Sequence, residues 1–245
     1  MVNIRQHDVT APVPDEEAEV QFVKAWGTYR KLVDNDYVFH REVYRILHQT
    51  LVEEVAGPFR FLDLACGDAR GIVGALTGAA VGHYHGVDLS RPALDLASTE
   101  LEALGCPVEL DQRDFVAAMA DRPEAADVVW IGLSLHHLQP ADKLVIMQEA
   151  RGVLEGKGQL MIYEPARREG ESREGYLERF ATTSQPLWSA LSDAEWTTIL
   201  DHVTHCDFPE TASGWLRLGG EAGFVRRDEL FIAPTDLYRL FRFQG

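Results

Sequence analysis

Apolar positions along the chain alternate between helical spacing and short runs typical of buried strands. Val43, Leu47, Leu51 and Val55 recur every four residues, which predicts a helix that stops at Gly57-Pro58. Strands are predicted where compact apolar runs follow turn residues: from Phe61, up to Asp88, and over 108–111, 127–131 and 159–164. Helical segments separate these strands. The alternation predicts an α/β fold with a doubly wound, mostly parallel sheet.

The segment after the fifth predicted strand is too long for one connection. About sixty residues separate Glu164 from Arg226, which predicts an inserted helical cap at about 165–223. Ser192 and Glu195 predict a capping box at the start of one cap helix. Residues 228–232 and 237–243 predict an antiparallel hairpin. We therefore expect an N-terminal arm with lid helices over 1–57 and the main domain over 58–245.

Two predicted strands end on an acidic residue, and the first leads into a turn of small residues. The turn reads Phe-Leu-Asp-Leu-Ala-Cys-Gly-Asp-Ala-Arg-Gly over 61–71, with Asp63 on the strand and Gly67 in the turn. Asp88 closes the next strand. No G-x-G-x-x-G run is present, and a carboxylate at Asp63 repels a diphosphate but suits a cationic ligand. This arrangement favours a cationic, adenosine-containing cofactor over a dinucleotide.

On these motifs the chain resembles the class I S-adenosylmethionine-dependent methyltransferases, specifically the small-molecule branch of the type 11 or type 12 kind. The resemblance covers roughly 59–165 and implies a seven-stranded, Rossmann-like methyltransferase fold, with the last strand inserted between the fifth and sixth. It implies S-adenosyl-L-methionine as cofactor, with Asp63 orienting the methionine end, Gly67 allowing close backbone approach and Asp88 holding the ribose. The further cofactor contacts that it implies are Ala65, Cys66, Leu89, Asp114, Phe115, Leu133, Tyr29 and Arg41.

The loop departs from the family pattern at two positions. The family's first and third glycines are Ala65 and Ala69 here. Alanine penalises a positive φ, so we expect the loop to follow a slightly different path or to use Gly67 alone for that conformation.

Three residues are candidates for proton transfer. His136 and His137 follow the fourth predicted strand, where a neutral imidazole beside the methyl group could accept a proton from an attacking hydroxyl or amine. The alternative is that one ring only packs there. Glu164, at the end of the fifth strand, is the third candidate. His202, His205 and Cys206 have helical spacing but no fourth ligand at a fixed offset, so no metal is predicted.

Aromatic residues outside the motifs are candidates for binding the acceptor. Tyr37, Arg41 and Tyr44 share one helical face, which could form a lid or simply pack on the sheet. Trp188 and Trp215 belong to the predicted cap. We expect Tyr37, Tyr44, Trp188 and Trp215 to contact the substrate.

Composition limits the partners. The formal net charge of −16 disfavours an extended nucleic-acid backbone as a ligand. Cys66, Cys106 and Cys206 form no disulfide pattern, and no signal core or membrane-spanning run is found, so we expect a cytoplasmic protein. The oligomeric state is left open.

The sequence thus predicts an enzyme that transfers a methyl group to an O, N or S nucleophile of a small metabolite or natural product. One alternative is a protein side-chain methyltransferase, because an acidic surface could attract a basic peptide. A non-catalytic module that binds S-adenosylmethionine is a second alternative, because the fold alone does not determine function. A nicotinamide enzyme ranks lowest.

Overall fold

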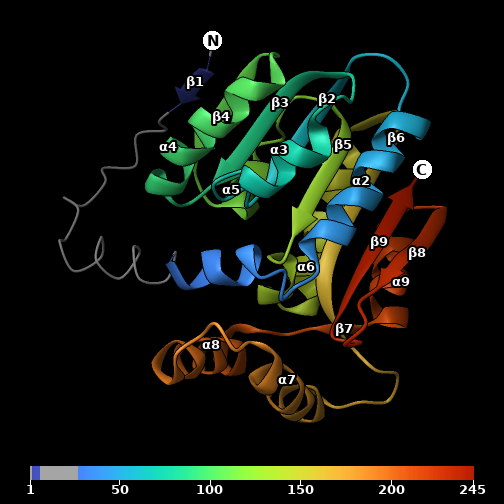
Figure 1. Ribbon diagram of the computed structural model, residues 1–245. Coiled ribbons are helices and arrows are strands. Elements are labelled where there is room, and N and C mark those ends of the chain that lie inside the picture. The colour runs from blue at the N-terminus through green and yellow to red at the C-terminus, as the bar shows by residue number, and fades with distance from the viewer. Residues whose placement is uncertain (1, 6–26) are drawn as a thin grey trace.

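A single twisted sheet forms the centre of the protein (Figure 1). The computed structural model describes residues 2–5 and 27–245. The strands of the described residues are β1 (Val2–Arg5), β2 (Phe59–Leu64), β3 (Val81–Asp88), β4 (Val108–Gln112), β5 (Ala126–Gly132), β6 (Leu154–Arg167), β7 (Glu210–Thr211), β8 (Arg226–Ile232) and β9 (Tyr238–Gln244). Their order is β1-β4-β3-β2-β5-β6-β9-β8, with the short β7 paired to β6.

The strand order confirms the predicted fold. The pairs among β4, β3, β2, β5 and β6 are parallel, and β9 lies antiparallel between β6 and β8. This is the seven-stranded pattern that the resemblance implied. Two strands were not predicted. β1 pairs with β4 through Val2↔Val108 to Arg5↔Asp111, so part of the N-terminal arm extends the sheet, while 6–26 lie outside the described residues.

Helices cover both faces of the sheet. On one face lie α2 (His40–Glu54), α3 (Arg70–Leu76), α4 (Arg91–Glu100) and η1 (Leu101–Leu104). On the other lie α5 (Phe115–Ala120), α6 (Pro140–Val153) and α9 (Ala212–Glu221). The predicted helix with apolar residues every four positions is confirmed in α2, where Val43, Leu47 and Leu51 are at most 1% exposed. Burying each such side chain contributes roughly 1.5–3 kcal/mol.

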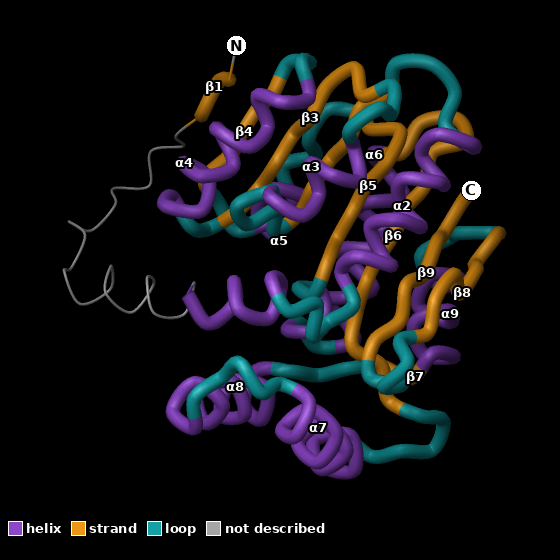
Figure 2. Tube along the Cα trace, in the orientation of Figure 1, coloured by secondary structure: helices purple, strands orange, loops and turns teal. Residues whose placement is uncertain are grey.

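The cap contains two helices, α7 (Arg173–Leu187) and α8 (Asp193–Cys206). They lie beyond the carboxyl ends of the parallel strands (Figure 2), and their buried aromatic side chains belong to the same core cluster as α2. The Ser192–Glu195 capping box is confirmed. α9 also falls within 165–223. Its buried Trp215 and Leu218 pack beside α6 in the core cluster on one face of the sheet. α7 and α8 are therefore the cap helices that stand over the carboxyl edge.

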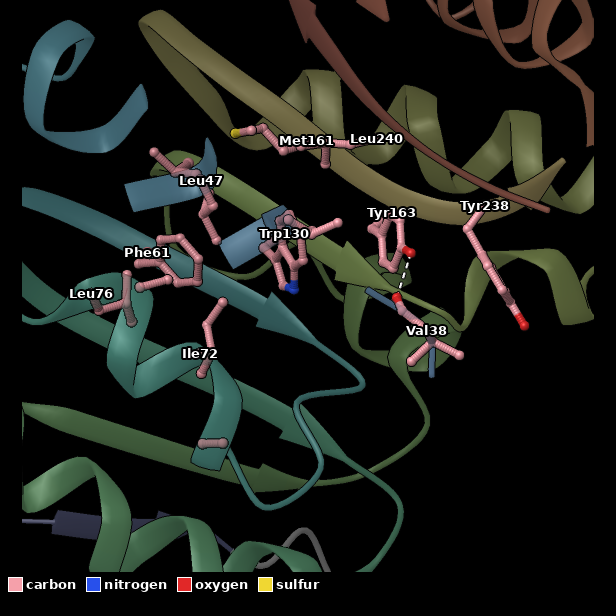
Figure 3. Close-up of a cluster of buried hydrophobic side chains, with 14 of the residues drawn as sticks. Val38, Leu47, Phe61, Ile72, Leu76, Trp130, Met161, Tyr163, Tyr238 and Leu240 are labelled. Atoms are coloured by element: carbon pink, nitrogen blue, oxygen red, sulfur yellow. Dashed lines mark hydrogen bonds between the residues drawn. The ribbon is translucent and has the colours of Figure 1, made fainter. Parts of the chain in front are cut away.

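The segment 27–39, which we call the lid, precedes α2 and reaches the carboxyl edge of the sheet. Residues 27–34 are helical and lie across that edge (Figure 1). Tyr163 of β6 donates a hydrogen bond through its hydroxyl to the Val38 carbonyl, at 2.5 Å, and Figure 3 shows this bond beside the buried Trp130. On the other side the lid meets the cap, where Lys31 Nζ lies 2.7 Å from Glu195 Oε1. The lid is thus held from both sides.

Candidate cofactor and acceptor site

The turn between β2 and α3 has left-handed backbone at three alternate positions. Ala65, Gly67 and Ala69 have φ of 59°, 57° and 55°. The expectation that Gly67 alone would adopt this conformation was wrong. The fold keeps both alanines in the left-handed region, which costs roughly 1–2 kcal/mol for each L-residue. The short side chains leave the backbone of the turn accessible.

Asp63 is a buried carboxylate at the start of this turn. Only 2% of the residue is exposed, and its Oδ2 accepts a hydrogen bond of 2.6 Å from the Tyr84 hydroxyl. Burial raises the pKa of Asp63 to about 7; the Tyr84 hydrogen bond opposes this rise and the charge of Asp88 adds to it. A cationic group nearby would favour the ionised form. Asp63 is therefore suited to hold an ammonium or sulfonium centre.

Asp88 connects the ends of β2 and β3. Its Oδ2 accepts a hydrogen bond from the Gly67 amide and its Oδ1 accepts one from the Ser90 amide, both at 2.8 Å. Burial raises the pKa of Asp88, and these amide bonds partly offset the rise. Because each carboxylate oxygen has a second lone pair, Asp88 can still accept hydrogen bonds from two ribose hydroxyls.

These residues line a cavity of about 220 Å³ at the carboxyl edge of the sheet. The predicted residues on its wall are Asp63, Ala65, Cys66, Gly67, Asp88, Leu133, Tyr29 and Tyr44. Burial raises the pKa of the Cys66 thiol, so this sulfur stays protonated at neutral pH. The structure thus brings together side chains from β2, β3, the end of β5, the lid and α2.

The lid side of the cavity is aromatic and includes a histidine that the sequence analysis did not select. His40 is 6% exposed, and its ring stacks on Tyr44 with 5.2 Å between centroids. Its Nδ1 is buried without a hydrogen-bond partner in the described part of the chain. Burial lowers the pKa of His40 to about 4, opposed by Asp36, so the imidazole is neutral at physiological pH. Its i, i+4 relation to Tyr44 was the signal that could have found it.

Tyr44 reaches the cavity because the second residue of α3 is a glycine, Gly71. A Cβ at Gly71 would lie 2.5 Å from the Tyr44 ring, so any larger residue would displace that ring. Trp130 and Tyr163 complete the aromatic wall, and the sequence analysis selected neither. Both come from adjacent strands whose side chains alternate between faces, a pattern that marks them as buried but not as cavity residues.

Four predicted cofactor residues do not line this cavity. Asp114 caps α5 by accepting hydrogen bonds from the Val116 and Ala117 amides, and Phe115 packs against the apolar cluster on the other face. Leu89 is 66% exposed. Arg41 is exposed and its guanidinium donates to the Asp34 carbonyl. Their contacts with the cofactor stay predictions.

Of the predicted substrate residues, Tyr44 alone lines the cavity. Tyr37 and Trp188 stack on each other, with 5.8 Å between centroids, and the Ala190 amide donates to the Tyr37 hydroxyl. This pair joins the lid to the cap. Trp215 is fully buried in α9, where its indole donates to the Pro165 carbonyl. Substrate contact by these three residues stays a prediction.

The predicted proton-transfer residues form a buried cluster that does not line the cavity. Glu164 is fully buried and accepts hydrogen bonds from the amides of 134, 135 and 136 and from His136 Nδ1, the last at 2.6 Å. Burial lowers the pKa of His136, but the carboxylates of Glu164 and Asp207 outweigh it and raise the pKa to about 9. His137 is exposed and lies beside Asp207. Glu164 therefore anchors the loop after β5.

Comparison with known proteins agrees with this geometry. Residues 61–158 match the family model described as a methyltransferase domain. The match includes β2, the left-handed turn, Asp88 and the loop after β5. Together with the fold, this match supports the resemblance to class I S-adenosylmethionine-dependent methyltransferases. No curated protein sequence matches the chain.

Solved structures share the fold of this methyltransferase domain at low sequence identity. An O-methyltransferase family protein from Burkholderia thailandensis is 18% identical, with a TM-score of 0.64 over 87% of this chain and 59% of its own. Magnesium protoporphyrin IX methyltransferase from Synechocystis, solved with bound SAH, is 13% identical, with a TM-score of 0.56 over 88% of this chain and 85% of its own. A possible exported protein from Bordetella parapertussis is 15% identical, with a TM-score of 0.62 over 84% and 67%. The chain spans little more than half of the Burkholderia protein.

The cavity fits the cofactor of this family, S-adenosylmethionine. Asp63 and Asp88 place two carboxylates on one wall, as a ligand with cationic groups and ribose hydroxyls requires. The alanines and Gly67 leave the backbone between them open. Within 2–5 and 27–245, the helices are all too short or too polar to cross a bilayer.

Proposed function

We propose that this protein transfers the methyl group of S-adenosylmethionine to an O, N or S nucleophile of a small metabolite or natural product. The observation that carries the proposal is the cavity itself, which joins the acidic wall of Asp63 and Asp88 to the aromatic side of His40, Tyr44 and Tyr163. When bound, the cofactor would supply an electrophilic methyl group on its sulfonium; the acceptor's nucleophile would bond to that methyl carbon in line as the C–S bond breaks and S-adenosylhomocysteine leaves. The lid and the stacked Tyr37–Trp188 pair enclose this edge of the sheet, which favours a small acceptor over a peptide.

The chain's residues contribute mainly by positioning. Asp63 and Asp88 hold and orient the cationic and ribose parts of the cofactor, and the aromatic side excludes water. Holding a nucleophile in line with the methyl group at about 3 Å can contribute roughly 7–11 kcal/mol. Little covalent chemistry is required of the protein.

His40 is the residue that we propose to meet the acceptor. Its unpartnered Nδ1 can accept a hydrogen bond from the nucleophile's O–H, N–H or S–H and hold that proton during transfer. The predicted roles of His136, His137 and Glu164 in proton transfer stay predictions. Cytoplasmic location also stays an expectation, which rests on the three free cysteines.

The first experiment is calorimetric titration with S-adenosylmethionine, S-adenosylhomocysteine and NAD, on the wild type and on Asp88→Ala. We expect binding of both adenosyl ligands, no binding of NAD, and loss of adenosyl binding in the variant. Release of S-adenosylhomocysteine is then measured with a panel of small phenols, amines and thiols. Cofactor binding without release on any acceptor would favour the non-catalytic alternative. No adenosyl binding by the wild type would refute the proposal.

His40→Phe tests the acceptor role, because phenylalanine keeps the stacking ring but removes both nitrogens. We expect S-adenosylmethionine affinity within about threefold of wild type and a kcat lowered by roughly 10²-fold for a hydroxyl acceptor. With a pKa of about 4, His40 should stay neutral and keep kcat at saturating S-adenosylmethionine well below pH 6.5. His48→Phe is the matched control, since His48 lies on the same helix but bonds the Ala75 carbonyl and does not line the cavity. An unchanged kcat in His40→Phe would refute the role.

A further inference from the structure

Three nitrogen and oxygen atoms from two separate segments converge beside the cap. His136 and His137 belong to the short helix η2 (Leu135–His137) after β5, and Asp207 follows the last residue of α8. Asp207 Oδ1 lies 3.5 Å from His136 Nε2 and 3.4 Å from His137 Nδ1. The three atoms lie within 4.8 Å of one another. This grouping was not visible in the sequence because α8 reaches η2 only through the fold.

The rings of His136 and His137 face the same carboxylate oxygen of Asp207. Asp207 is 5% exposed, and its Oδ1 has no hydrogen-bond partner within the described ranges. Both lone pairs of a buried carboxylate oxygen are costly to leave unsatisfied. His137 Nδ1 has one further contact, at 3.3 Å from the Cys206 carbonyl, which is long for a hydrogen bond. A cation placed among these atoms would satisfy all three.

The distances fit a tetrahedral metal ion. With metal–ligand bonds of about 2.0–2.1 Å, the ligand atoms of a tetrahedral site lie about 3.3–3.4 Å apart. The observed 3.4 and 3.5 Å agree with this spacing. His202 of α8 lies next to this group without belonging to it, with its Nε2 4.0 Å from the same Asp207 oxygen and its ring edge-on to that of His137 at 5.2 Å.

The surroundings also match those of metal sites. Metal-binding histidines usually donate their second ring N–H to a carboxylate, which fixes the ring and its tautomer. Glu164 accepts such a bond from His136 Nδ1 at 2.6 Å and is itself held by three backbone amides. The side chains of His137 and His202 are 36% and 56% exposed, which leaves a path from solvent to the buried half of the cluster.

We propose that His136, His137 and Asp207 form a three-residue binding site for a divalent transition-metal ion of the Zn²⁺ class. Imidazole and carboxylate donors in tetrahedral spacing suit Zn²⁺ and its close analogue Co²⁺. The site differs from the sequence expectation of no metal, and it uses none of His202, His205 and Cys206 as a ligand. Its ligands come from η2 and from the end of α8, so the ion would tie the cap to the loop after β5. Metal binding requires neither the cofactor nor the acceptor.

The test is direct titration of chelator-treated, full-length protein with Zn²⁺, followed by calorimetry, and with Co²⁺, followed by visible absorption. We expect one Zn²⁺ per chain and the absorption bands of tetrahedral Co²⁺. Asp207→Asn and His137→Ala should each weaken Zn²⁺ binding at least about tenfold, and His202→Ala should weaken it less. Zn²⁺ should raise the Tm of the wild type but not of Asp207→Asn. Circular dichroism of the metal-free proteins checks that the variants fold.

Two control variants make the result specific. His205→Ala removes an exposed histidine of α8 whose ring contacts the carbonyl and the carboxylate of Asp201, and this variant should bind Zn²⁺ as the wild type does. His85→Ala disrupts a second group of possible ligands, His85, Glu109 and Asp111, and should also leave the site intact. The proposal is overturned if the wild type binds no Zn²⁺ in a saturable way. It is equally overturned if Asp207→Asn binds Zn²⁺ as the wild type does, or if His85→Ala alone abolishes binding.

Discussion

Asp63 in β2 and Glu164 in β6 are both buried carboxylates near the carboxyl edge of the sheet, but their hydrogen bonds differ. Glu164 accepts four bonds, three from backbone amides and one from His136. Within the described residues Asp63 accepts one side-chain hydrogen bond, from the Tyr84 hydroxyl, and it lines the cavity. A carboxylate whose acceptor sites are filled by its own chain anchors a loop, whereas one with few partners remains able to bind a ligand. Position at a strand end does not separate these roles.

The largest expected effect is on stability, when Glu164, which anchors the loop after β5, is replaced. Glu164→Ala leaves the buried His136 without its main carboxylate partner and three amides without an acceptor, so we expect a loss of about 3–5 kcal/mol in the free energy of unfolding. Chemical denaturation measures this loss. Glu164→Gln, which keeps an acceptor oxygen, should lose less. The control is Glu169→Ala, which removes an exposed carboxylate bonded to Ser213 and should change stability by less than about 1 kcal/mol. Equal losses in Glu164→Ala and this control would remove the distinction.

Replacing Asp63 should weaken cofactor binding strongly and increase the stability of the protein. Asp63→Asn keeps an acceptor for the Tyr84 hydroxyl but loses the charge, and S-adenosylmethionine affinity should fall by about 100-fold, or roughly 2.7 kcal/mol. The folded pKa of about 7 lies above the unfolded value of 3.8, so the folded state holds an extra proton between these values and stability falls as the pH rises through them. At pH 8 the variant should therefore be more stable than wild type by roughly 1–3 kcal/mol.

The same carboxyl gives the affinity a pH dependence. Because a cationic ligand binds the ionised form of Asp63, wild-type affinity should fall as the pH drops below about 7. The Asp63→Asn variant should show no such fall. Calorimetry at pH 6, 7 and 8 checks both, with Asp95→Asn as the control for loss of an exposed charge. A parallel pH dependence in wild type and Asp63→Asn would show that another group is responsible.

The smallest expected effect concerns the stability of the turn between β2 and α3, compared with that of α3 itself. Ala69 has φ of 55°, so Ala69→Gly removes steric strain and should stabilise the protein by about 0.5–1 kcal/mol. Ala75→Gly, in the interior of α3, should destabilise it by at least about 1 kcal/mol. Denaturation midpoints of the two variants should move in opposite directions. A shift of both in the same direction would mean that the turn is not strained.

Local patterns were sufficient for most of the fold and for one wall of the site. The spacing of Val43, Leu47 and Leu51, the capping box at Ser192 and the strand-end acids Asp63 and Asp88 are properties of short segments, and the structure has each where the sequence placed it. Hydrophobic periodicity and capping depend on neighbouring residues, so a sequence carries them directly. The conformation of Ala65 and Ala69 was predicted wrongly. A left-handed alanine costs roughly 1–2 kcal/mol, and the tertiary structure outweighs this local cost.

Only the tertiary structure decided which distant side chains meet. His40 reaches the cavity because α2 packs over β2 and β5, and Trp215 is buried in the core because α9 joins α6. Asp207 meets His136 and His137 because α8 ends against the loop after β5. The sequence by itself determined the sheet, its helices and the acidic turn, since these follow from patterns within a few residues. The acceptor side and the histidine cluster depend on how the lid and cap pack against that sheet, and no local spacing contains that information.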